Sequence, residues 1–249
     1  MTRTTEACPW DLMDILQVFA LYFFMVLLGS TVLITLVRKV LGVDPVALLG
    51  TNAVVLILSL MTNVFSCLFV FFIVSFRYRQ PVSALGLSLM SWKGNLFQGF
   101  LRYLVAFPII MSVGFLVEFV SSSLGVMPQS QEVVLRVMEE TSFVVLGTMV
   151  FLGAVAGPMA EEILFRGFLQ PALRDMLGKS WAILLSAFFF SLVHLNLYIF
   201  LQIFILGLLL GYLFEKTGTL VAPIAIHMLH NSMVLTFVLW FKQKGGFLG

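Results

Sequence analysis

The chain has 249 residues, of which 61% are hydrophobic and 10% are charged, and its formal net charge is +2. An ordinary soluble domain has about 45–50% apolar and about 25% charged residues. A soluble enzyme of this size could not bury so much apolar surface, and disorder requires the opposite composition. The small net charge gives no reason to expect a nucleic-acid partner. We therefore expect an integral, multi-pass protein of the lipid bilayer.

Seven apolar bands follow one another along the chain. A helix needs ~20 mostly apolar residues to cross a bilayer, so we expect about seven membrane helices, or eight if the long second band is broken near Asn52 or Asn63. The predicted fold class is all-α, a polytopic bundle of transmembrane helices. The bands cover residues 15–37, 46–76, 96–120, 143–169, 181–195, 198–214 and 220–241.

The connection between the third and fourth bands is long enough to form an element of its own. Its apolar and charged residues separate onto two helical faces, which predicts a short amphipathic helix lying at the membrane interface. The apolar face holds Val133, Val134, Val137 and Met138, and the charged face holds Glu132, Arg136, Glu139 and Glu140. We expect variable helices and this connector in residues 1–140, a functional core in 141–241 and a tail in 242–249.

Two adjacent carboxylates lie in the otherwise apolar fourth band. An ionisable group inside a membrane segment costs at least about 2.5–3.5 kcal/mol and is by default a functional candidate. Glu162 and Arg166 have the i,i+4 spacing of an ion pair, and this leaves Glu161 without a partner in its own helix. A charge cluster at a helix end is the alternative reading, but a lone ion pair would need only one carboxylate.

All three histidines of the chain lie in the same half of the sequence, on two further helices. His194 ends one helix near Asn196. His227 and Asn231 share one face of the last helix through i,i+4 spacing, whereas His230 lies further round. Hydrogen bonds between membrane helices would account for any one of these residues alone.

Taken together, these side chains suit the activation of water. A glutamate can accept the proton, one histidine can hold the water, and a second histidine and an amide can donate hydrogen bonds to an oxyanion. The same groups could instead ligate zinc or another divalent metal through Glu161, His194 and His227, with a fourth position left for water.

Small residues and a proline lie close to the carboxylates. Pro158 precedes them by about one turn and predicts a kink or a freed carbonyl. Gly153 and Gly157 in this helix, and Gly207 and Gly211 in the sixth band, would let helices approach closely. Ordinary helix packing explains the glycines equally well.

The spacing of the polar residues resembles the signature of the CPBP family, also called Abi. That family contains the CAAX prenyl proteases and the bacteriocin-processing or immunity proteins. The resemblance covers about residues 143–241, and Ala84-Leu85-Gly86-Leu87 resembles a further feature often seen there. The three motifs are Glu161-Glu162-x-x-x-Arg166 with the following Gly167, Phe190-x-x-x-His194, and His227-x-x-x-Asn231.

The resemblance implies an intramembrane endopeptidase built as a helical bundle. Both a metal-dependent and a glutamate-type mechanism are compatible with it, and His230 is not a motif position. By motif position, Glu161 would be the base for the attacking water, His194 would orient that water, His227 and Asn231 would form the oxyanion hole, and Glu162 and Arg166 would support the site.

The expected partners are the bilayer and a peptide or membrane-protein substrate, either prenylated or unmodified. The main alternative is a non-proteolytic immunity or scaffold protein of the same family. A proton-coupled transporter could also use the carboxylates as a relay, although transporters often contain internal repeats and none is evident here. The sequence contains no retention or anchor motif, which fits a prokaryotic inner membrane.

Overall fold

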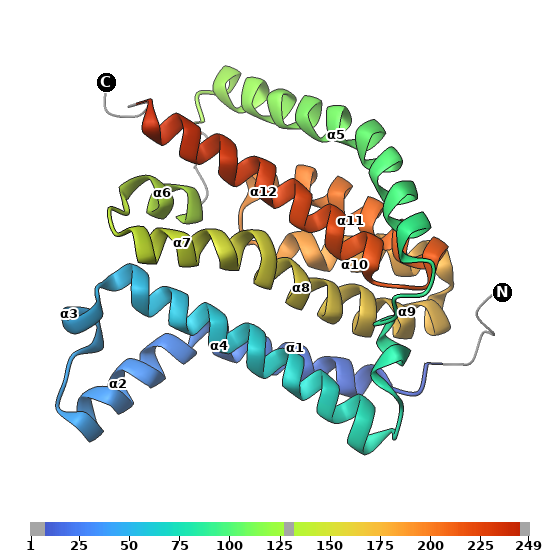
Figure 1. Cartoon of the computed structure of the whole chain (residues 1–249), viewed down its shortest axis with the longest axis horizontal. Helices are drawn as coiled ribbons and strands as arrows, with labels where there is room; N and C mark the ends of the chain where they lie inside the picture. Colours follow the sequence, from blue (N-terminus) through green and yellow to red (C-terminus); the bar gives the residue numbers. More distant parts are fainter. Residues whose placement is uncertain (1–7, 127–131, 245–249) are drawn as a thin grey trace.

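A computed structural model describes residues 8–126 and 132–244 of the chain, and Figure 1 shows their arrangement. Within these ranges the regular structure is entirely helical, which confirms the predicted all-α class. The elements are α1 (Leu12–Leu27), α2 (Gly29–Leu41), α3 (Pro45–Leu49), α4 (Thr51–Phe72), η1 (Ile73–Arg77), η2 (Val82–Leu85), α5 (Trp92–Ser123), α6 (Glu132–Glu139), α7 (Phe143–Phe151), η3 (Leu152–Ala156), α8 (Gly157–Glu162), η4 (Ile163–Leu169), α9 (Gln170–Leu177), α10 (Lys179–Leu192), α11 (Leu197–Thr217) and α12 (Val221–Gln243).

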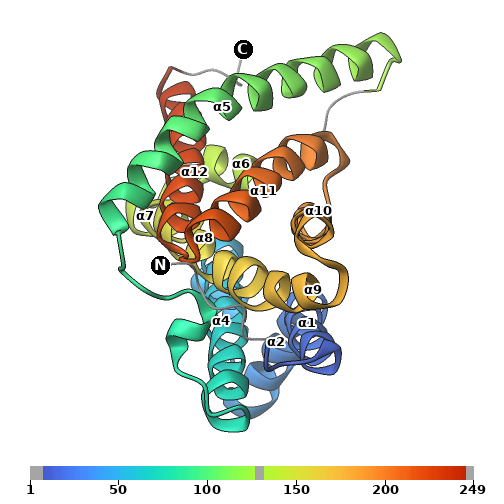
Figure 2. The same ribbon diagram turned by 90° about the vertical axis from the view of Figure 1, so that its right-hand side faces the viewer.

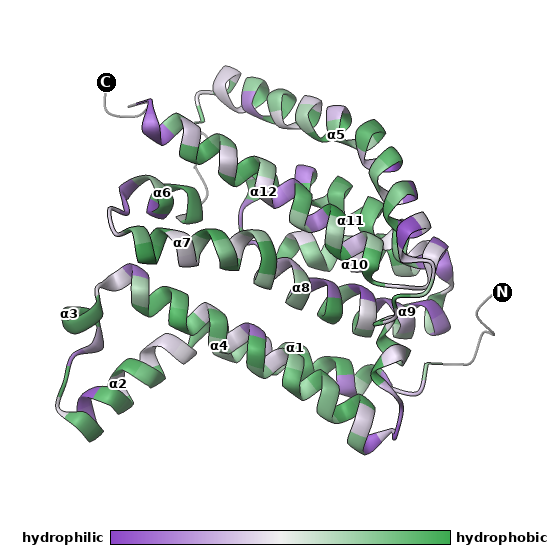
Figure 3. Cartoon of the chain, in the orientation of Figure 1, coloured by the Kyte–Doolittle hydropathy of each residue, from purple (hydrophilic) through white to green (hydrophobic). Residues whose placement is uncertain are grey.

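All seven apolar bands are helical, but they differ in their ability to cross a bilayer. Five continuous helices in the described ranges are long and apolar enough to do so, and a sixth crossing arises if the bent pair α1–α2 counts as one span. The count is lower than seven because α10 has only 14 residues, fewer than the ~20 that a crossing needs. Figure 3 shows the apolar residues spread along these helices. The five helices are 51–77, 92–123, 143–177, 197–217 and 221–243.

The first two bands are interrupted, each at a different kind of break. Helices α1 and α2 meet at Leu28 with a bend of 59°. The second band breaks at Gly50, whose φ of 82° is a left-handed conformation that glycine adopts without strain. That position is two residues before Asn52, one of the two predicted sites, and α4 continues without interruption through Asn63.

The helices pack in layers around the long helix that runs from α7 to α9. Helices α1 and α4 cover one side of it, while α10, α11 and α12 cover the other, and α5 lies outside α11 and α12 (Figures 1 and 2). The largest buried cluster joins Val18 of α1, Val70 of α4, Phe165 of η4 and Phe190 of α10. The N-terminal helices therefore share one core with the helices that carry the motifs.

A buried tryptophan just before α1 connects this helix to η4. The indole N–H of Trp10 donates to the carbonyl of Phe168 over 2.8 Å, and the two rings stack with their centroids 5.2 Å apart. At the start of α1, the buried carboxylate of Asp14 accepts from the Tyr78 hydroxyl and pairs with Arg77. These contacts hold α1 against both η1 and η4.

Two π-helical segments, η3 and η4, flank the six residues of α8. In η3 the N–H of Gly157 bonds the carbonyl of Leu152, five residues earlier. The next carbonyl, that of Gly153, would need the N–H of Pro158 in the same pattern, and proline has none. The predicted freed carbonyl is thus present, and π-bulges of this kind occur often at functional sites.

The connector forms α6, which confirms the predicted short helix. Val137 is fully buried, and Val134 and Met138 pack in the same cluster as Leu235 of α12. Val133, predicted on the same face, is exposed. Residues 127–131 of the connector, 245–249 of the tail and the side chain of Glu132 lie outside the described part of the chain.

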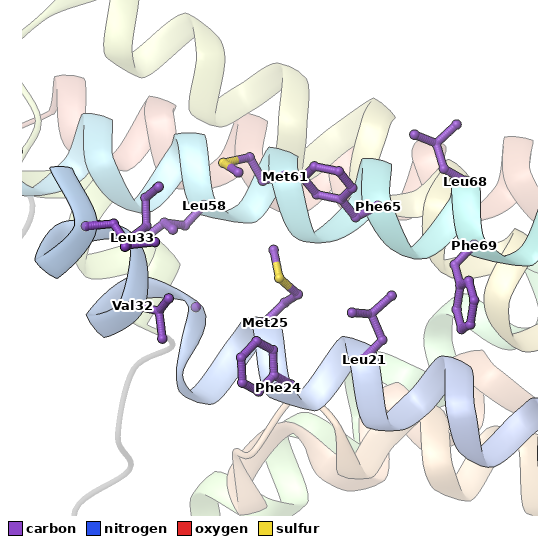
Figure 4. Close-up of a pocket in the computed structure, with 12 residues that line it drawn as sticks. Leu21, Phe24, Met25, Val32, Leu33, Leu58, Met61, Phe65, Leu68 and Phe69 are labelled. Carbon is purple, nitrogen blue, oxygen red and sulfur yellow. The ribbon is translucent and has the colours of Figure 1, made fainter. Parts of the chain in front are cut away.

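An apolar cavity of about 540 Å³ lies between α1, α2 and α4 (Figure 4). None of the motif residues lines it, so we give it no part in the chemistry of the site. Its lining residues are Leu21, Phe24, Met25, Gly29, Val32, Leu33, Leu36, Leu58, Met61, Phe65, Leu68 and Phe69.

Candidate active site

The three motifs come from different helices that the fold brings together. Glu161 and Glu162 end α8, and Arg166 follows within η4. His194 lies in the turn after α10, and His227 lies on α12, which packs against α8. The structure therefore brings the two carboxylates together with the histidines of the later helices, as the sequence predicts.

The carboxylate of Glu162 is the hub of the site. It is fully buried, and its Oε1 lies 2.8 Å from Nη1 of Arg166 and 2.9 Å from Nδ1 of His227. A buried carboxylate is costly unless it is paired and hydrogen-bonded; both donors reach Oε1, whereas the buried Oε2 has no hydrogen-bond partner among the described residues. The predicted Glu162–Arg166 pair is observed, and it also reaches the last helix through His227.

Arg166 is itself held on three sides although it is fully buried. Besides Glu162, it donates from Nη2 to the carbonyl of Gly207 over 3.1 Å. Its guanidinium carbon lies 4.3 Å from the centroid of the Phe190 ring, which is cation–π geometry. A guanidinium suits this position because its planar fork can serve several acceptors and an aromatic face at once.

Glu161 occupies a different environment from its neighbour. Its side chain is 24% exposed, and its Oε2 lies 3.7 Å from Nε2 of His227. That distance is too long for a direct hydrogen bond, but one water can bond to both atoms across such a gap. Glu161 is thus the accessible carboxylate, while Glu162 is committed to Arg166 and His227.

The contacts of His227 determine what its ring nitrogens can do. An ionised carboxylate only accepts hydrogen bonds, so Nδ1 carries a hydrogen and donates a hydrogen bond to Glu162. The neutral ring then presents a bare Nε2 toward Glu161, and the doubly protonated ring presents a donor there. Glu162 therefore orients this histidine, as carboxylates commonly do for functional imidazoles.

His194 is oriented by its own helix. Its Nδ1 lies 2.7 Å from the carbonyl of Phe190, one turn earlier, so Nδ1 is the donor and Nε2 is left to accept. The ring of Phe190 packs edge-to-face on both His194 and His227, with centroids 5.0 Å and 5.5 Å apart. The sequence analysis gave Phe190 no role in the site. Its place in the Phe190-x-x-x-His194 motif was the feature that could have indicated one.

Asn231 uses the carbonyl that Pro158 leaves free. Its Nδ2 donates to the carbonyl of Gly153 over 2.9 Å. The amide has two N–H groups, so this bond still leaves one for the predicted oxyanion role. Gly153, which the sequence analysis related only to helix packing, and Pro158, which it related to a freed carbonyl, thus place the side chain of Asn231.

Two further features surround the site. His230 bonds through Nδ1 to the Tyr103 hydroxyl of α5 over 3.0 Å, so it faces another helix from His227. Leu85 from the Ala84–Leu87 stretch packs on Gly167, where an added Cβ would lie 3.0 Å from the Leu85 carbonyl oxygen. The glycine after Arg166 therefore allows this stretch to cover η4.

The donor chemistry of the set would suit zinc, but the arrangement does not. In the part of the chain that the structure describes, no three His, Cys, Asp or Glu side chains form a group that could hold a metal ion. The orientation of the two imidazoles does not itself exclude a metal, because Nδ1 of His227 donates to Glu162, Nδ1 of His194 donates to the Phe190 carbonyl, and both Nε2 atoms are left free. We derive no step through a metal, and the choice between the two mechanisms stays a prediction.

The helices that build this site are those that match known proteins. Residues 143–233 match the family described as type II CAAX prenyl endopeptidase Rce1-like. Over 87 residues the chain is 30% identical to YdiL of Bacillus subtilis strain 168, which is named as a candidate membrane peptidase. That alignment spans 35% of this chain and 36% of YdiL, so it covers about a third of either protein. No solved structure matches the chain significantly.

The matches confirm the resemblance to the CPBP family, and the family model covers the segment that contains all three motifs. The apolar helices are those of an integral, multi-pass membrane protein, and residues 143–233 of the chain are similar to the CAAX-type membrane peptidases.

Proposed function

We propose that this chain is a membrane-embedded endopeptidase that hydrolyses a peptide bond with water activated by Glu161. The observation that carries the proposal is the division of labour between two adjacent carboxylates. Glu162 is buried and paired with Arg166, whereas Glu161 is partly exposed and faces His227 across 3.7 Å. A base must reach its water, and Glu161 is the carboxylate that meets this condition.

The proposed reaction uses the remaining residues for orientation and charge stabilisation. Glu161 accepts a proton from water as the oxygen attacks the carbonyl carbon, and the bare Nε2 of His194 accepts a hydrogen bond from the same water. The doubly protonated His227 and the second N–H of Asn231 donate to the oxyanion. When the C–N bond breaks, Glu161 returns its proton to the leaving amine.

We propose a peptide or membrane-protein substrate with a scissile bond near the membrane. A prenylated substrate agrees with the name of the matched family, and an unprenylated one with the bacterial relative. The Bacillus relative also favours a prokaryotic cell membrane as the location of this chain.

The test is cleavage by the purified full chain, in detergent, of a pool of fluorogenic peptides with and without a prenyl group. We expect wild-type protein to cleave members of the pool and Glu161→Ala to cleave none. Glu118→Ala is a matched control, because Glu118 is an exposed glutamate on α5, away from the site. Cleavage that survives Glu161→Ala would overturn the assignment of the base.

A further inference from the structure

Four residues beyond Arg166, a fully buried glutamine makes a second link to the same helix. The side-chain amide of Gln170 donates from Nε2 to the carbonyl of Gly211 over 3.0 Å and to Oε1 of Glu215 over 3.0 Å. Arg166 donates to the carbonyl of Gly207, four residues before Gly211. The long helix and α11 are therefore joined by two bonds from side chains to backbone carbonyls, one turn apart, in addition to the bond with Glu215.

These bonds depend on the glycines of α11. A Cβ on Gly211 would lie 2.9 Å from Oε1 of Gln170, closer than real Cβ contacts allow. A Cβ on Gly207 would lie 3.0 Å from the Cβ of Ala187 on α10. The glycines thus let α11 lie between the helix of Arg166 and the helix that ends in His194.

The second bond adds to the packing of α11 on α10, α5 and α12. The bond between Arg166 and Gly207 fixes one point of α11 relative to the long helix. The bond from Gln170 to Gly211 fixes a second point, and so helps to set the angle between these two helices. Glu215 adds to the effect, because its side chain is 5% exposed and its nearest cation, Lys179, is 3.9 Å away. Gln170 is thus its close hydrogen-bond donor.

We propose that Gln170 is a positioning residue for the peptidase site and acts through α11. By fixing that helix it keeps the Gly207 carbonyl in reach of Arg166, and so keeps Glu162 and His227 in register. Because α11 packs closely on α10, it also sets the position of Phe190 and His194. The inference rests on the proposed function for its catalytic consequence, while the geometry of the two bonds is independent of it.

The kinetic test compares Gln170→Leu, which removes the amide at similar volume, with Gly211→Ala, which pushes on Gln170 from the other helix. We expect each to lower kcat by at least ~10-fold with little change in KM, since small misplacements of reacting groups are costly. The double variant should be no slower than Gln170→Leu alone. Thr62→Val is the control, because Thr62 is a buried hydroxyl bonded within its own helix, α4.

A second measurement does not need activity. The chain has three histidines, so we expect one signal from each in detergent after labelling with ¹³C-histidine. Gln170→Leu should shift the signals of His194 and His227 and leave that of His230, which Tyr103 holds from α5. Unchanged signals and unchanged kcat would overturn the positioning role. A wild-type protein that cleaves nothing, but whose signals shift as expected, would count against the proposed function and leave the positioning role standing.

Discussion

Arg166→Met tests the physical basis of the site, because it removes the permanently charged partner of Glu162. Both side chains are fully buried, and their closest atoms are 2.8 Å apart. Removing one partner of a buried pair costs about 3–5 kcal/mol, since the other charge is left uncompensated. We therefore expect the free energy of unfolding to fall by about 3–5 kcal/mol, at least ~100-fold in the equilibrium constant.

The assay is equilibrium unfolding in mixed micelles, followed by tryptophan fluorescence. Arg38→Met is the matched control, because Arg38 and Asp44 are 2.6 Å apart but have side chains 54% and 39% exposed. Exposed pairs contribute about 0–1 kcal/mol. Adding Glu162→Gln to Arg166→Met should recover much of the stability by removing the unpaired charge. A loss for Arg166→Met no larger than that for Arg38→Met would refute the reasoning.

Three other predictions concern the carbonyl, the pH dependence and the metal. Pro158→Ala supplies an N–H to the Gly153 carbonyl, so we expect Asn231 to lose this acceptor. The value of kcat should then fall in the peptide assay, while the temperature midpoint of unfolding stays the same. An unchanged kcat would contradict this prediction. The hydrogen bond from Asn52 lowers the pKa of Glu140 below 4.5. The ionised Glu140 therefore stabilises the folded protein above pH 4.5, and this stabilisation is lost as the pH falls through the lower pKa of the folded state. The difference in melting temperature between wild type and Glu140→Gln should shrink as the pH is lowered over this range. A difference that stays constant with pH would exclude the effect. Treatment with EDTA should leave the cleavage rate unchanged, whereas a loss that added zinc reverses would place the water on a metal.

The sequence predicted well those features that depend on residues close to one another along the chain. Apolar bands mark helices because the bilayer requires length and hydropathy, and i,i+4 spacing predicted the Glu162–Arg166 pair. Pro158 predicted a freed carbonyl because a missing N–H is a property of the residue alone. The roles proposed for Glu161, His194 and His227 stay predictions until activity is measured.

Contacts between helices could not be predicted in the same way. The bond from Trp10 to the Phe168 carbonyl and the position of Phe190 against two histidines depend on how helices pack, which hydropathy does not specify. The bend at Leu28 could not be predicted either, because no proline lies near it. Gln170 has no ionisable group, so no rule about charged residues in membranes drew attention to it.

The central claim is that Glu161 activates water for peptide hydrolysis, and cleavage in ¹⁸O-labelled water tests it most directly. We predict that the wild-type product gains one labelled oxygen in its new carboxylate, while Glu161→Gln, which keeps the shape but loses the base, forms no product. Labelled product formed by Glu161→Gln at the wild-type rate would contradict the account.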